Sequence, residues 1–150
     1  MPATKTRKSD NVFSEEERAA VQATARERKS HGKLTPEQER AAGLQDLRDS
    51  LAKMPPDDRA MGERIHEIVS AAVPALAPKT YYGMPAYAKD GKTIAFYKAK
   101  SKFKVRYSTV GFQPDATLDD GAMWATEFAV IELTPKVEAR IAELVKKASG

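Results

Sequence analysis

Five positively charged side chains occupy every second position of one segment: Lys98, Lys100, Lys102, Lys104 and Arg106. We expect a turn near Lys100, followed by a strand in which Lys104 and Arg106 face solvent and Tyr97 lies opposite them. Cations beside an aromatic ring can bind phosphates and stack a base. The candidate residues for phosphate or nucleic acid are therefore Lys98, Lys102, Lys104 and Arg106. The alternative is a solvated edge strand whose charges oppose aggregation.

Acidic residues gather further along the chain. Asp115, Asp119 and Asp120 lie in one predicted loop, and Glu127 begins the strand predicted to follow it. Carboxylate oxygens are the ligands that hard cations prefer, and without thiolates they suit a weak, exchangeable site. These four residues are the candidate metal ligands, with iron as the metal considered. The alternative is a solvated loop, because aspartate is also common in turns.

A third group is aromatic and surrounds the turn predicted at residues 83–85. Its members are Tyr81, Tyr82, Met84 and Tyr87, and Trp124 precedes the last predicted strand. Tyrosine hydroxyls can orient a small molecule in a pocket lined by rings. The alternative is that the rings pack in the core, with Trp124 anchoring its loop there.

The sequence contains no recognisable catalytic constellation. Its 150 residues include no cysteine, which excludes disulfides, thiolate metal sites and cysteine nucleophiles. Glu63 and His66 form one Glu-x-x-His unit, but a di-iron bundle needs a second copy. A Gly-x-Ser-x-Gly motif, a phosphate loop and a dinucleotide fingerprint are all missing. We therefore predict that the protein is not an enzyme.

The composition gives little information about partners. The net charge of +4 is too small by itself to indicate nucleic acid. Residues 71–78, the longest weakly polar run, contain two prolines and are far too short to cross a membrane. Because no apolar leader segment is visible, we expect a cytoplasmic protein without a membrane partner. The sequence does not indicate an oligomeric state.

The chain divides into a basic disordered tail at 1–12, a peripheral helical arm at 13–43 and the main domain at 44–150. In the arm, Ser14 and Glu17 form a capping box that starts a helix running to about residue 29. This helix has one large apolar residue, so it has little to bury.

The main domain contains helices, then strands, then a helix. Thr35 starts a helix with leucines at spacings of three and four, Asp57 caps a second helix, and Thr134 starts the last one. The predicted strands cover residues 80–87, 92–98, 103–110 and 127–133, with Phe103, Val105 and Tyr107 facing inward. Because the strands form one block without intervening helices, we predict an α+β fold with an antiparallel sheet.

The stretch Tyr81-Tyr82-Gly83-Met84-Pro85-Ala86-Tyr87, followed by Asp90-Gly91-Lys92, resembles the YdhG-like family, a domain of unknown function. The similarity continues through residues 102–107, 119–124 and 132–134, and covers roughly residues 44–148. It implies a small cytoplasmic domain with a curved antiparallel sheet packed by helices. Some relatives are described as frataxin-like iron chaperones with acidic surface sites, so iron and an iron-accepting protein are the implied partners.

Three functional hypotheses follow. The leading one is a small cytoplasmic binding protein that handles iron through surface carboxylates, as the resemblance implies. The alternatives are a phosphate- or nucleic-acid-binding module that uses the basic segment, and a small-molecule pocket around Tyr82 and Met84. The first two hypotheses depend on side chains of opposite charge. Iron binding should depend on Asp119 and Asp120, and nucleic-acid binding on Lys104 and Arg106.

Overall fold

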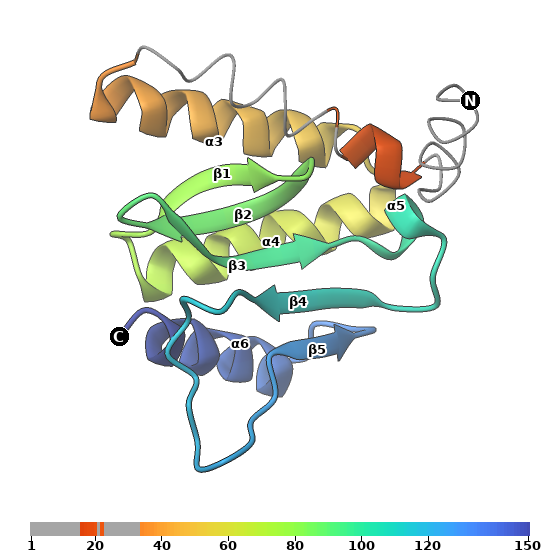
Figure 1. Cartoon of the computed structure of the whole chain (residues 1–150). Helices are drawn as coiled ribbons and strands as arrows, with labels where there is room; N and C mark the ends of the chain where they lie inside the picture. The colour runs from red at the N-terminus through yellow and green to blue at the C-terminus, as the bar shows by residue number, and fades with distance from the viewer. Residues whose placement is uncertain (1–15, 21, 23–33) are drawn as a thin grey trace, which may run out of the picture.

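The computed structural model describes residues 16–20, 22 and 34–150, which build an antiparallel sheet and the helices that pack on it (Figure 1). The strands are β1 (Ala77–Tyr81), β2 (Met84–Lys89), β3 (Lys92–Lys98), β4 (Ser108–Phe112) and β5 (Glu127–Val130). The helices include α3 (Pro36–Ala52), α4 (Pro56–Ala72), α5 (Lys100–Phe103) and α6 (Pro135–Ala148). The sheet is open, and its order β1-β2-β3-β4-β5 follows the chain, which confirms the α+β prediction.

Two helices begin as predicted. The hydroxyl of Thr35 accepts the amide of Gln38 at 3.2 Å, and the Gln38 side chain accepts the Thr35 amide at 3.1 Å, which completes the capping box of α3. The hydroxyl of Thr134 caps α6 by accepting the amide of Val137 at 3.2 Å. The prediction for α4 is wrong, because Pro55 occupies the cap position without a side-chain hydrogen bond. Asp57 instead lies in the first turn of α4.

The helix α3 packs against the sheet on both sides of the predicted boundary between arm and domain, as its contacts with β1 and β2 show. Gly43, on the predicted boundary between arm and domain, is buried, and a Cβ there would overlap the carbonyl of Pro78 in β1. The boundary between residues 43 and 44 therefore falls inside one continuous helix. Of the helix predicted from Ser14, residues 16–20 and 22 are helical. The predicted tail and the rest of that helix lie outside the described residues.

The helices α3, α4 and α6 cover one face of the sheet. The main core joins Tyr87, Ala95, Tyr97, Val110 and Phe112 from the strands with apolar residues of α3, α4 and α6. In Figure 1, α4 runs behind β2 and β3. A register shift between β2 and β3 places Ala95 and Tyr97 on this covered face, so that Phe96 and Lys98 point to the other face. None of the described helices is long and apolar enough to cross a membrane.

A buried carboxylate ties α4 to α5. Asp58 is only 2% exposed, and its two oxygens accept hydrogen bonds from Lys100 Nζ at 2.7 Å and from the Ser101 amide at 3.2 Å. The hydroxyl of Tyr97 donates to the carbonyl of Asp58 at 2.9 Å. Burial alone would raise the pKa of the Asp58 carboxyl, but together the bonds from Lys100 and Ser101 hold that pKa below its ordinary value.

The strand predicted over residues 103–110 is wrong in its first half. Residues 100–103 form α5, Lys104 adopts the left-handed conformation at φ 54°, and β4 begins only at Ser108. The amide of Val105 donates to the carbonyl of Lys100 at 3.0 Å, which closes the helical turn. Since Lys100 and Ser101 are held by Asp58, a distant contact outweighs the local alternation. The ends of two predicted strands also differ. The strand predicted to end at residue 110 continues to Phe112 in β4, and the strand predicted to end at residue 133 stops at Val130 in β5.

We expect Asp58→Asn to lower the free energy of unfolding at pH 7 by about 1.5–3 kcal/mol, because it weakens a charge-assisted bond. The pKa of the Asp58 carboxyl is lower in the folded chain than its ordinary value of 3.8. The stabilisation is therefore present above this value and is lost as the pH falls through the folded-state pKa.

Urea denaturation at neutral pH and near pH 3 measures this dependence. Asp57→Asn, a substitution at the exposed neighbouring residue, is the matched control and should change stability little. A difference between wild type and Asp58→Asn that stays constant across this range would contradict the assignment.

Candidate functional site

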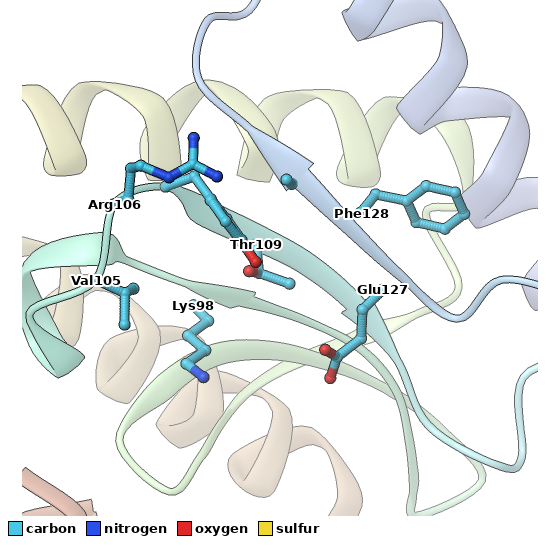
Figure 2. Close-up of a pocket in the computed structure, with 8 residues that line it drawn as sticks. Lys98, Val105, Arg106, Thr109, Glu127 and Phe128 are labelled. Carbon is cyan, nitrogen blue, oxygen red and sulfur yellow. The ribbon is translucent and has the colours of Figure 1, made fainter.

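The open face of the sheet carries a hollow over β3, β4 and β5 (Figure 2). Its volume is about 600 Å³, within the range of small-ligand sites. The lining residues are Lys98, Val105, Arg106, Tyr107, Thr109, Glu127, Phe128 and Ala129. Figure 2 shows that the side chain of Phe128 points away from Lys98 and Glu127. The polar and charged side chains therefore define the chemistry of this hollow.

The strand register explains why these residues meet. Lys98 pairs with Thr109, which pairs in turn with Ala129, and one row further Gly111 pairs with Glu127. Because side chains alternate between faces, the intervening residues of β4 turn toward the helices. Positions 98, 109 and 127, from three neighbouring strands, therefore share the open face.

Two cations of the hollow lie against aromatic rings. Lys98 Nζ is 4.7 Å from the centroid of the Phe103 ring, and the Arg106 guanidinium is 5.2 Å from that of Tyr107. Within the described part of the chain, neither cation forms an ion pair with a carboxylate. Tyr107 itself is 36% exposed. The arrangement combines positive charge with flat surfaces on which a base can stack.

A glycine in β4 makes room for an aromatic ring beside the hollow. A Cβ at Gly111 would overlap the Phe96 ring, which lies over this position from β3. Phe96 packs with Met84 and Ala86 in a second core cluster on the open face. This cluster, hereafter the Phe96 cluster, also receives the partly buried residues Tyr81, Tyr82 and Phe103. It fills the open face beside the hollow.

The structure divides the four cations that we predicted to bind phosphate. Lys98 and Arg106 line the hollow. Lys102 Nζ instead donates to the carbonyl of Tyr82 at 2.9 Å, and Lys104 Nζ lies 2.7 Å from the Glu16 carboxylate. Only two of the four therefore reach a common site.

The expected placement of the aromatic residues in this segment is wrong. Tyr97 is 1% exposed on the helix-covered face instead of lying beside the cations. Val105 and Tyr107 are exposed rather than inward-facing, and Phe103 is half-buried in α5. Sequence reasoning missed Tyr107 and Thr109 as site residues. For Thr109, which is 8% exposed, the available signal was the alternation of β4, in which Val110 and Phe112 belong to the core on the opposite face.

The predicted metal ligands do not converge. Asp115, Asp119, Asp120 and Glu127 are all exposed. Asp115 lies 4.0 Å from Lys92, and Glu127 belongs to the hollow. In residues 16–20, 22 and 34–150, no group of three or more histidine, aspartate or glutamate side chains is placed to hold a metal ion. Iron binding by these carboxylates stays a prediction.

The predicted aromatic pocket is split between the two faces. Tyr81 and Tyr82 meet edge to face at 4.6 Å in the Phe96 cluster, together with Met84. Tyr87 lies on the helix side, where its hydroxyl is 2.9 Å from His66 Nδ1 and burial raises the pKa of its phenol. Trp124 is 40% exposed and belongs to neither core cluster, so the expectation that it anchors its loop to the core is wrong.

Comparisons of the chain with family models, with curated proteins and with solved structures give no match. The resemblance to the YdhG-like family therefore stays a prediction that rests on the quoted motifs. The support for a function comes instead from the side chains that the sheet brings together, and above all from those that line the hollow.

We expect Gly111→Ala to lower the free energy of unfolding by about 1–3 kcal/mol, because the added methyl group overlaps the Phe96 ring. The ring cannot move away freely, since the Phe96 cluster packs around it. In a Phe96→Leu background the same substitution should cost less than half as much. Chemical denaturation of the four proteins in this double-mutant cycle measures the coupling, and strictly additive costs would show that the two residues do not interact.

Proposed function

We propose that the protein binds single-stranded nucleic acid on the open face of its sheet. The observation that carries this proposal is that Lys98 and Arg106 line one hollow beside the exposed ring of Tyr107. No carboxylate of the described chain pairs with either cation, so both are available to a phosphate.

The chemistry of each group suits part of such a ligand. The planar guanidinium of Arg106 can hold a phosphate through two parallel hydrogen bonds, and Lys98 adds a flexible point charge. Tyr107, with Arg106 against its ring, offers a stacking surface that every base can use. The hydroxyl of Thr109, on the central strand of the hollow, can bond to a sugar or phosphate oxygen.

Two phosphate contacts support weak, salt-sensitive binding. Each contact with a single strand contributes a slope of about −0.7 to the dependence of log K on log salt, so we expect about −1.4 in total. Dissociation constants in the range of about 10⁻⁴–10⁻⁶ M are typical of such electrostatic binding. The overall charge of +4 also favours the approach of an anionic strand.

The geometry favours this proposal over iron handling. A hard cation needs several converging oxygen ligands, whereas the acidic candidates of the described chain are dispersed. The acidic candidate in the hollow, Glu127, shares that hollow with two cations. The proposed role is therefore binding of an anionic ligand, without a reaction.

We expect Arg106→Glu to weaken binding of a fluorescent single-stranded RNA at least about tenfold at low salt, because it replaces attraction by repulsion. Lys98→Glu should act in the same direction. Fluorescence anisotropy of the full chain measures both variants. Lys146→Glu is the matched control, because it makes the same charge change at an exposed position of α6.

Competition titrations identify which part of the RNA is recognised, and a variant of the acidic loop tests whether its carboxylates take part. Inorganic phosphate and free mononucleotides should compete with the RNA more weakly than an unlabelled strand, because they make fewer contacts. Asp119→Asn combined with Asp120→Asn should leave RNA binding intact. Undetectable binding of RNA at low salt, or equal binding by wild type and Arg106→Glu, would refute the proposed function.

A further inference from the structure

The hollow contains a carboxylate as well as its cations. Glu127 lies on β5 opposite Gly111, whereas Lys98 lies on β3 opposite Thr109. The two residues are therefore two strands apart, which is about 10 Å across the sheet at a strand spacing of about 4.8 Å. Along the strands they are offset by the two residues that separate Thr109 from Gly111. Glu127 forms no ion pair within the described residues. It is an exposed acceptor, and Figure 2 shows it at the opposite end of the hollow from Arg106.

A carboxylate at this place disfavours a bare phosphate, because like charges repel across the hollow. It favours a ligand that carries negative charge at one end and hydrogen-bond donors at the other. An ionised carboxylate only accepts hydrogen bonds, and its two oxygens can take two parallel N–H bonds at once. Among the common bases, guanine presents adjacent ring N–H and amino donors on one edge, cytosine and adenine present an amino group, and uracil a ring N–H.

The spacing from Tyr107, just before β4, to Gly111 within β4 fits two neighbouring nucleotides. Tyr107 and Gly111 are four residues apart, which is at most about 14 Å of extended chain at about 3.4 Å per residue. Glu127 pairs with Gly111, so its row is separated from the Tyr107 stacking surface by the row of Thr109. We therefore place the base that contacts Glu127 on the nucleotide next to the one that stacks on Tyr107.

We infer that Glu127 selects guanine at one position of a bound single strand. In this arrangement one base stacks on Tyr107, a phosphate lies between Lys98 and Arg106, and a neighbouring guanine donates two hydrogen bonds to the Glu127 carboxylate. The inference rests on the proposed function and adds base selectivity to it.

The test compares the affinities of four RNA pentamers that differ only in the central base of a uridine strand. The full-length wild-type chain should bind the guanine-containing pentamer about tenfold more tightly than all-uridine RNA, the discrimination typical of one bidentate base contact. Glu127→Gln keeps the size of the side chain but loses the paired acceptors, so this preference should disappear. Its affinity for all-uridine RNA should rise, because a repulsive charge has been removed.

Glu132→Gln is the matched control, because it removes the same charge from an exposed residue just beyond β5 and should retain the guanine preference. Amide NMR spectra of both variants check that the fold is intact. Equal binding of all four pentamers by the wild type, or a guanine preference that survives in Glu127→Gln, would overturn this inference alone. Binding that also remains sensitive to Arg106→Glu would leave the proposed function standing, whereas no binding of any pentamer would overturn both.

Discussion

The position of the proposed binding surface depends on the buried carboxylate of Asp58. A buried anion is tolerated only when its hydrogen-bonding capacity is filled, and here Lys100 and Ser101 supply the donors. Both donors belong to α5, so satisfying Asp58 forces the chain after β3 into a helical turn. That turn ends in the left-handed Lys104 and returns the chain to the sheet at Ser108. Residues 105–107 consequently flank the sheet, where Arg106 and Tyr107 border the hollow.

The same contact determines which cations remain for a ligand. Of the five alternating basic residues, Lys100 pairs with Asp58, Lys102 bonds to a main-chain carbonyl and Lys104 pairs with Glu16. Each of these bonds holds α5 or its surroundings in place. The two cations outside this network, Lys98 and Arg106, are those that line the hollow. The five basic residues look alike in the sequence, but in the structure three of them hold α5 or its surroundings in place and two line the hollow.

The features that local residues determine could be predicted. Thr35 and Thr134 cap their helices, and Asp90 and Gly91, both with positive φ angles, connect β2 to β3. The helix α5 could not be predicted, because its partner Asp58 lies 42 residues before Lys100. Because this helix was not predicted, Tyr107 was wrongly predicted to face inward on a strand. Tyr97 was misplaced because the register shift between β2 and β3 decides which face it takes, and no local pattern records the shift.

The residues that maintain the fold are largely separate from those proposed to contact the ligand. Asp58, Phe96 and Gly111 act through buried contacts, so their substitution changes stability. Lys98 and Glu127 lie on paired strands, Arg106 lies on the segment just before β4, and none of the three forms an ion pair within the described residues. Their charges can therefore be reversed or removed at little cost to folding. A loss of RNA binding in their variants would consequently report on recognition itself.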